Sequence, residues 1–182
     1  METTVIADYS LIPDDPPPSN RRNPSHLQIN YNKPWAYFEG ATQEQGCGGG
    51  AILHLSHHHS CSMLIGLRRC TNNSAELLAA KHIIQFALEK NCTELQLYGD
   101  SKIICDWLNR KTRCSIYTLF HILDETLRLI SHFDSFTCTH IYREQNGSAD
   151  SLSKEAGIWM IREQEGDSFF QYYHRPFMNL NI

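Results

Sequence analysis

Four acidic residues occur where the sequence pattern changes from a strand to a turn or enters a helix: Glu39, Glu76, Asp100 and Asp150. Carboxylate oxygens are the ligands that Mg²⁺ prefers, at about 2.0–2.1 Å. Two such ions about 3.5–4 Å apart can stabilise the attacking and leaving oxygens of a phosphoryl transfer. If the fold brings the four carboxylates together, they predict a two-metal site in which all four are catalytic and metal-binding residues.

Each carboxylate also has a purely structural explanation. Asn73 and Glu76 have the spacing of a capping box at a helix start. Asp100 is a suitable N-cap for a helix from Ser101, and Asp150 lies in a first helical turn, where the dipole favours negative charge. The remaining acidic residue, at the end of the first predicted strand, can simply face water. Singly these explanations are favoured, but together the positions favour one site, because functional groups gather at the carboxyl ends of strands in open α/β sheets.

The elements that must position these residues follow from periodicity. Aromatic, alternating or apolar runs bounded by glycines and polar turns predict five strands, over residues 35–39, 51–55, 61–67, 95–98 and 136–141. Apolar residues at helical spacing predict four helices, from Asn72 or Asn73 onward and over residues 103–108, 117–130 and 146–156. The first three strands can form an antiparallel meander, and helical crossovers make the first and fourth strands parallel neighbours. The order predicts an α/β domain with a mixed sheet.

Composition divides the chain into three parts. Five of the seven prolines lie in residues 1–30, which predicts an extended tail, either an untied terminus or a ligand for a protein partner. Residues 31–157 carry the predicted domain, and residues 158–182 form an aromatic C-terminal arm that we expect to pack irregularly. At 182 residues in total, one domain is expected. The net charge of −4 argues against binding to nucleic acid mainly through bulk electrostatics.

The cysteines and the N-terminus bear on the compartment. Seven cysteines, an odd number without any C-x-x-C spacing, favour reduced core thiols over disulfides or zinc. The N-terminus has neither a signal core nor the look of a transit peptide, and no segment reaches the ~18 apolar residues of a membrane helix. We expect an intracellular protein, in the nucleus or cytoplasm, with no membrane partner.

Two further clusters are ambiguous. The run His57, His58 and His59 lies at a predicted hairpin tip, which lacks a fixed ligand geometry, so a metal site there is disfavoured. The connector with Arg110, Lys111 and Arg113 is equally a phosphate contact or a solvated linker.

Four strings carry a family resemblance, and they read Tyr37-Phe38-Glu39-Gly40-Ala41, Thr71-Asn72-Asn73-Ser74-Ala75-Glu76-Leu77, Tyr98-Gly99-Asp100-Ser101-Lys102 and the stretch from His140 to Lys154. Over about residues 35–156 the chain resembles the ribonuclease H type 1 family, and it is most similar to the domains of plant retroelement reverse transcriptases. The resemblance implies a ribonuclease H-like fold with a five-stranded mixed sheet in the order 3-2-1-4-5, flanked by helices. It also implies endonucleolytic hydrolysis of the RNA strand of an RNA–DNA hybrid.

The same resemblance assigns roles to residues. It implies two Mg²⁺ ions, or Mn²⁺, held by the four carboxylates named above. It implies that Asn72 and Asn73 contact the hybrid in its minor groove, where the 2′-hydroxyl distinguishes RNA from DNA. In the loop before the last helix, Arg143 is the candidate nucleic-acid contact, to phosphate or to product, unless no residue there makes one. The expected partner is the hybrid or another nucleic acid, and the expected state is a monomer.

The chain departs from the family pattern in two places. Glu39 stands where the family has aspartate, and a misplacement of about 1 Å can cost ~10²-fold in rate. A catalytically inactive, retroelement-derived module that binds nucleic acid or protein therefore stays an alternative. Many relatives also place a histidine in the loop that here spans residues 142–146, which has none; His140 lies within a predicted strand and is expected to be structural.

Overall fold

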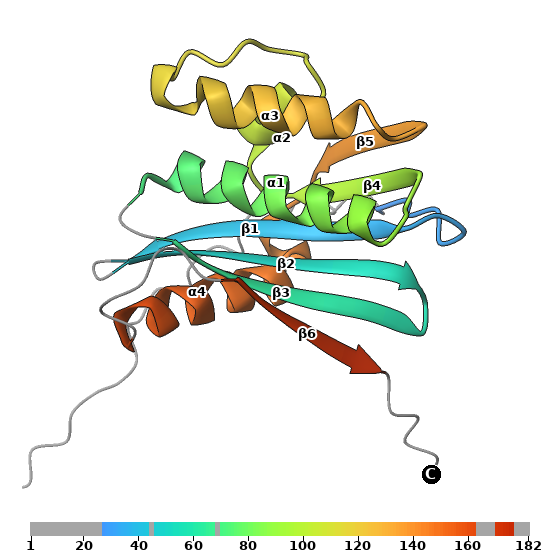
Figure 1. The fold of residues 1–182 in the computed structure, drawn as a ribbon, viewed down its shortest axis with the longest axis horizontal. Helices are drawn as coiled ribbons and strands as arrows, with labels where there is room; N and C mark the ends of the chain where they lie inside the picture. The colour runs from blue at the N-terminus through green and yellow to red at the C-terminus, as the bar shows by residue number, and fades with distance from the viewer. Residues whose placement is uncertain (1–26, 44–45, 68–69, 163–169, 177–182) are drawn as a thin grey trace, which may run out of the picture.

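The fold is built on a six-stranded mixed sheet in the order β5-β4-β1-β2-β3-β6 (Figure 1). The computed structural model describes residues 27–43, 46–67, 70–162 and 170–176. β1 pairs antiparallel with β2 and parallel with β4, and β4 is parallel with β5. The predicted order 3-2-1-4-5 and the parallel neighbours are therefore confirmed. The strands are β1 (Trp35–Gln43), β2 (Gly46–Ser56), β3 (His59–Leu67), β4 (Glu94–Gly99), β5 (Ser135–His140) and β6 (Phe170–Pro176).

The sixth strand corrects the expectation of an irregular C-terminal arm. β6 pairs antiparallel with β3, from His59↔Pro176 to Ile65↔Phe170. Aromatic residues favour strands, and without β6 the β3 edge would present unpaired backbone groups. The last helix also runs to Arg162, beyond the predicted end at residue 156. The remaining arm residues lie outside the described part, and the predicted boundary at residue 157 stays a prediction.

Helices cover both faces of this sheet (Figure 1). α1 (Asn72–Glu89) packs on β1 and β2, and α4 (Gly147–Arg162) packs on the opposite face against β1, β2 and β3. α2 (Lys102–Leu108) and α3 (Phe120–Ile130) complete the layer on the α1 side. The predicted helix over residues 117–130 begins as a 3₁₀ turn, η1 (Tyr117–Leu119), before α3. A second 3₁₀ turn, η2 (Arg143–Gln145), precedes α4.

The start of α1 differs from the predicted caps. The N-cap is Thr71, whose Oγ1 accepts a hydrogen bond from the Ser74 backbone N–H at 3.3 Å. Neither Asn72 nor Asn73 caps the helix, because both lie inside its first turn. α2 likewise begins after Ser101 rather than Asp100. The shift of one residue leaves the side chain of Asp100 free of a capping role.

The core lies between α1 and the sheet and extends under α2 and α3. Its largest fully buried side chains include Phe38, Ile83, Leu97 and Trp107, each worth roughly 1.5–3 kcal/mol relative to exposure. On α3 the predicted inward residues Leu123 and Thr126 are buried. The predicted apolar periodicity therefore identified the faces that pack.

The end of the predicted N-terminal tail is attached to the sheet. Leu27 and Ile29 pack against a small cluster of Trp35, Tyr98 and Ile141. The backbone N–H of Asn30 also donates to Gln96 Oε1 at 2.9 Å, and Gln96 Nε2 donates to the Asn30 carbonyl at 2.8 Å. Residues 1–26 lie outside the described part.

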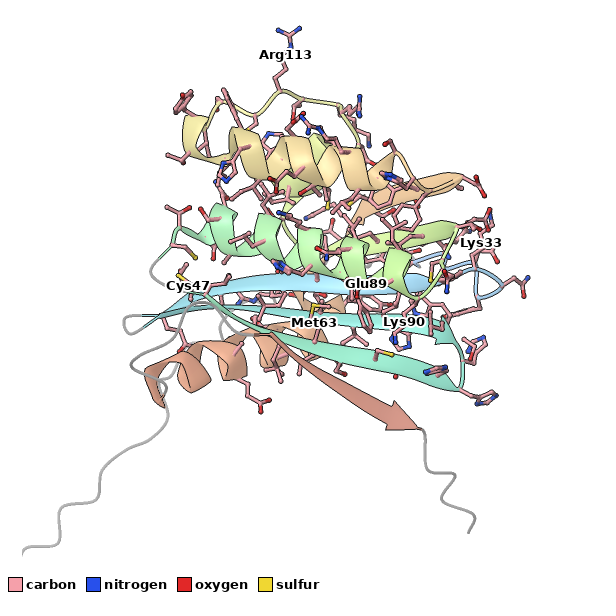
Figure 2. The ribbon with its side chains drawn as sticks, viewed as in Figure 1. Lys33, Cys47, Met63, Glu89, Lys90 and Arg113 are labelled. Atoms are coloured by element: carbon pink, nitrogen blue, oxygen red, sulfur yellow. The ribbon has the colours of Figure 1, made fainter. Side chains whose placement is uncertain are left out.

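The two ambiguous clusters lie at the surface of the fold. The His57 ring lies 4.5 Å from the Tyr31 ring and 5.6 Å from that of Trp35. Arg110, Lys111 and Arg113 are exposed, and Figure 2 shows Arg113 pointing away from the fold. The seven cysteines all fall within the described residues and are free thiols, five of them buried. Within the described ranges, the helices are too short or too polar to span a bilayer.

Two glycines allow helices to approach the sheet closely. A Cβ atom on Gly40 would lie 2.2 Å from the backbone nitrogen of Glu76 in α1. A Cβ atom on Gly50 would lie 2.4 Å from the Ala149 carbonyl oxygen in α4. Both clashes are with backbone atoms, which cannot rotate away. The absence of a side chain therefore sets the spacing of α1 and α4 from the sheet.

We expect Gly40→Ala to destabilise the fold by at least about 1–3 kcal/mol, because α1 must shift to admit the methyl group. Chemical denaturation followed by circular dichroism measures this. Gly147→Ala is the matched control, since a Cβ there meets nothing within 4 Å. Equal stability of the two variants would contradict the packing argument.

Candidate active site

Three of the four predicted carboxylates meet at one end of the sheet. Glu39 lies on β1, Asp100 follows β4, and Glu76 lies on α1. One ligand oxygen of each lies within 4.8 Å of the others, which makes this the only such group of three or more acidic, histidine or cysteine side chains in the described part of the chain. They line a cleft of about 500 Å³ together with Asn72, Ser101, Arg143 and Lys154, among others. The convergence predicted from distant parts of the sequence is present for these three.

The strand register explains the meeting of Glu39 and Asp100. Tyr37 pairs with Tyr98 in the parallel β1–β4 ladder, and each carboxylate lies two residues further along. Glu76 reaches the same edge because α1 touches β1 at Gly40. The Gly40 backbone N–H donates a hydrogen bond to the Glu76 carboxylate, which helps to lower its pKa. The Glu76 side chain therefore contacts the sheet instead of capping its own helix.

Burial and crowding disfavour the charged forms of Glu39 and Glu76. Burial, with a hydrogen bond to Asp100 and repulsion from Glu76 and Asp100, raises the pKa of Glu39 to about 9. Burial, and then the charge of Asp100, raises the pKa of Glu76 to about 8. The exposed fractions of Glu39 and Glu76 are 4% and 3%. Positive charge in the cleft would favour their ionised forms.

The donors fit a hard divalent cation. All three side chains offer carboxylate oxygens, the ligands suited to Mg²⁺ or Mn²⁺. Glu76 Oε2 is buried and has no hydrogen-bond partner among the described residues. A buried acceptor without a partner is costly, and a cation would satisfy it. The cleft therefore combines repulsion that a cation would relieve with an oxygen that a cation could bind.

Asp150 stands apart from this group of three. Its Oδ1 accepts from Arg143 Nη2 at 2.8 Å, and its Oδ2 accepts from Lys154 Nζ at 2.6 Å. Burial raises the pKa of Asp150, but the hydrogen bonds from Lys154 and Arg143 outweigh it, so the net shift is downward. The predicted meeting of four carboxylates is thus present for three, whereas both oxygens of the fourth are engaged by cations. The role of Asp150 as a metal ligand stays a prediction.

The predicted nucleic-acid contacts lie at or near the cleft. Asn72 is exposed and lines it, whereas Asn73 is half-buried in the same helical turn and is not among the lining residues. Arg143 lines the cleft with its side chain 66% exposed. His140, at the end of β5, contacts the Asp100 carbonyl oxygen through Nε2 at 3.1 Å. That contact fits the structural role expected for His140.

Two residues at this site received no role from the sequence. Lys154 lies on α4 one turn beyond Asp150, so the i, i+4 spacing was the available signal for their pairing. Asn146 donates from Nδ2 to Glu39 Oε2 at 2.8 Å across 107 positions of sequence. No local pattern could have indicated that contact.

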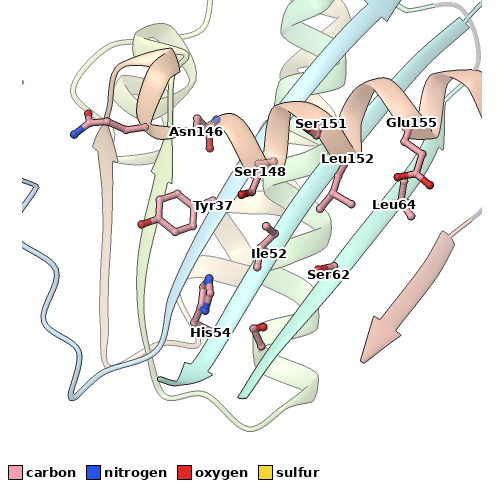
Figure 3. Close-up of a pocket in the computed structure, with 13 residues that line it drawn as sticks. Tyr37, Ile52, His54, Ser62, Leu64, Asn146, Ser148, Ser151, Leu152 and Glu155 are labelled. Carbon is pink, nitrogen blue, oxygen red and sulfur yellow. The ribbon is translucent and has the colours of Figure 1, made fainter. Parts of the chain in front are cut away.

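A larger groove, of about 960 Å³, lies beside α4, on the face of the sheet that this helix covers (Figure 3). Tyr37, Ile52 and Leu64 line it from the strands, and Ser148 and Leu152 line it from α4. It lacks a cluster of acidic side chains, and the candidate chemistry therefore belongs to the smaller cleft.

The raised pKa values predict how stability depends on pH in the absence of metal. A carboxyl group whose pKa is raised on folding contributes fully to stability below the pKa that it has in the unfolded chain, 4.5. That stability is lost as the pH rises through the folded-state pKa values of about 8 to 9. We expect Glu39→Gln to flatten this fall between about pH 5 and pH 9, because glutamine cannot lose a proton. Urea unfolding of both proteins in EDTA measures it. Parallel pH profiles would contradict the raised pKa of Glu39.

Comparisons with known proteins agree with this geometry. A family model described as reverse transcriptase-like matches residues 38–156. RNase H1 from the halophilic archaeon Halobacterium salinarum NRC-1 is 28% identical, with a TM-score of 0.61 over 68% of this chain and 96% of that one. The N-terminal RNase H domain of a Mycobacterium tuberculosis protein, solved as a fusion with maltose binding protein, is 21% identical, with a TM-score of 0.64 over 73% of this chain and 99% of that one.

LC11-RNase H1, isolated from compost by a metagenomic approach and solved in complex with an RNA/DNA hybrid, is 22% identical, with a TM-score of 0.57 over 71% of this chain and 99% of that one. The comparison with curated proteins gives no match. The family match spans most of the folded domain, and the solved structures share its sheet and helices. The chain therefore belongs to the reverse transcriptase-like family and has the ribonuclease H fold.

Proposed function

We propose that this chain hydrolyses the RNA strand of RNA–DNA hybrids endonucleolytically, with two Mg²⁺ or Mn²⁺ ions as cofactors. The observation that carries the proposal is the cluster of Glu39, Glu76 and Asp100, buried or half-buried at the mouth of one polar cleft. The solved RNase H1 in complex with an RNA/DNA hybrid supports the substrate class. Asp150 is the fourth proposed ligand.

The three clustered carboxylates would hold the metal, whose chemistry is to polarise a phosphoryl oxygen and lower the pKa of water. The carboxylates themselves supply negative charge that fixes the cation at the cleft. Arg143 and Lys154 line the same cleft and can neutralise phosphate oxygens. Asn72, exposed at the rim, can donate to or accept from a ribose hydroxyl. Together these side chains offer an acidic centre flanked by two cations and an amide.

A second candidate function is a non-catalytic module that binds nucleic acid or protein. Two observations favour it: the first carboxylate is the longer Glu39, and both oxygens of Asp150 are engaged by cations. A ligand set disturbed by about 1 Å can lose ~10²-fold in rate. In this reading the fold would retain the cleft without the chemistry.

The primary test is cleavage of a labelled RNA–DNA hybrid with Mg²⁺ or Mn²⁺. We expect the full chain to cut the RNA strand, and Asp100→Asn to lose at least about 10²-fold in rate, because one ligand charge is removed. EDTA should abolish cleavage. Equal cleavage by the chain and by Asp100→Asn would trace the activity to contamination and remove the proposal.

Glu39→Asp separates the two candidate functions. If the unaltered chain is an enzyme whose site fits glutamate, we expect this substitution to lower the rate, by up to about 10²-fold, because the shorter side chain moves the carboxylate by about 1 Å. The same hybrid assay measures it, at several Mg²⁺ concentrations. A change from no cleavage to clear cleavage would instead establish the non-catalytic module.

A further inference from the structure

The side-chain amide of Asn146 joins α4 to the first carboxylate of the site. Asn146 is 1% exposed. Its Nδ2 donates to Glu39 Oε2 at 2.8 Å and to the Phe38 carbonyl oxygen at 2.9 Å. Both hydrogens of one amide group are therefore used by neighbouring residues of β1. Figure 3 shows Asn146 at the start of α4, beside the sheet.

The orientation of this amide is fixed by its acceptors. The opposite orientation would place Oδ1 against a carbonyl oxygen and a carboxylate oxygen, which cannot both donate. In the observed orientation Oδ1 is buried with no hydrogen-bond partner among the described residues. An unpaired buried acceptor costs free energy. The two hydrogen bonds to β1 must therefore determine where the side chain lies.

The backbone of Asn146 is also held firmly. Its N–H donates to the Arg143 carbonyl at 3.0 Å, and its carbonyl accepts from the Asp150 N–H at 3.0 Å. The preceding turn is closed by a reciprocal capping interaction between Tyr142 and Gln145. The amide thus projects from a rigid junction between η2 and α4, and a rigid support is what precise positioning of a ligand requires.

We propose that Asn146 is the positioning residue that allows a glutamate to act as the first metal ligand of this site. The inference rests on the proposed function and deepens it. Glutamate has one more rotatable bond than aspartate, so its carboxylate can swing unless one oxygen is held. Asn146 holds Oε2 at hydrogen-bond distance and thereby fixes the carboxylate beside Glu76 and Asp100. An aspartate at this position would end one methylene short of the amide.

A double-mutant cycle on Mg²⁺ affinity, measured by titration calorimetry, tests the proposal. We expect Asn146→Ala to weaken Mg²⁺ binding roughly tenfold or more in the natural chain, because a hydrogen bond to a charged ligand is lost. In the Glu39→Asp background we expect the same substitution to weaken binding less than about threefold, because the contact is already absent. Ser148→Ala, an exposed position two residues further on, is the matched control and should leave affinity unchanged.

Asn146→Leu provides an uncharged variant of similar side-chain size that removes the donor, in case the alanine variant does not fold. Circular dichroism melting of each protein in EDTA identifies such a failure. Equal weakening in both backgrounds would overturn the proposal, since Asn146 would then act only through the Phe38 carbonyl. Unchanged affinity, or no Mg²⁺ binding by the natural chain, would overturn it as well.

Hybrid cleavage by the four proteins of the cycle keeps this proposal distinct from the proposed function. Coupled Mg²⁺ affinities without cleavage would leave the positioning role standing and remove the ribonuclease. Cleavage with uncoupled affinities would keep the ribonuclease and remove the positioning role.

Discussion

Repulsion among three acidic side chains is the constraint around which this end of the molecule is organised. Glu39, Glu76 and Asp100 are brought together by the pairing of β1 with β4 and by the packing of α1 on β1. Burial at the sheet edge raises the pKa of Glu39 to about 9 and that of Glu76 to about 8. A fold that keeps such a cluster forgoes the stability that neutral side chains would give. Functional sites are where proteins typically tolerate such a conflict.

The neighbouring elements limit the conflict without removing it. Gly40 donates its backbone N–H to Glu76, and Asn146 donates its amide to Glu39. Neither contact supplies a formal charge, so the centre stays acidic and open to a cation. The two cationic side chains that line the cleft, Arg143 and Lys154, form ion pairs with Asp150 instead. Among the described residues, ion pairs therefore reach the fourth carboxylate but not the acidic centre beside it.

The junction between η2 and α4 links these features. Within eight positions it presents Arg143, Asn146 and Asp150 to the same edge of the sheet. Gly50 lets the helix that follows approach β2 at backbone contact distance. Packing of α4 on the sheet therefore determines the position of the proposed fourth ligand, its ion-pair partners and the amide that holds Glu39. The packing that stabilises α4 therefore also fixes the geometry of the site.

The sequence alone determined which residues had to be considered and where the sheet would bring them. Period-two and helical patterns identified the strands and helices, and the parallel pairing of the first and fourth strands placed Glu39 and Asp100 at one edge. These features are local, or follow from connection rules, and so they can be inferred from sequence. The resemblance to ribonuclease H likewise rested on short strings in the right order.

Tertiary structure decided what those side chains do to one another. The cap at Thr71 rather than at an asparagine, the pairing of β6 with β3, the ion pairs of Asp150 and the reach of Asn146 to Glu39 were all open in the sequence. Each depends on which of several competent partners lies within about 3 Å after packing, a distance that spacing along the chain does not specify. Residues 107 positions apart share a hydrogen bond here because two backbones are held close by packing.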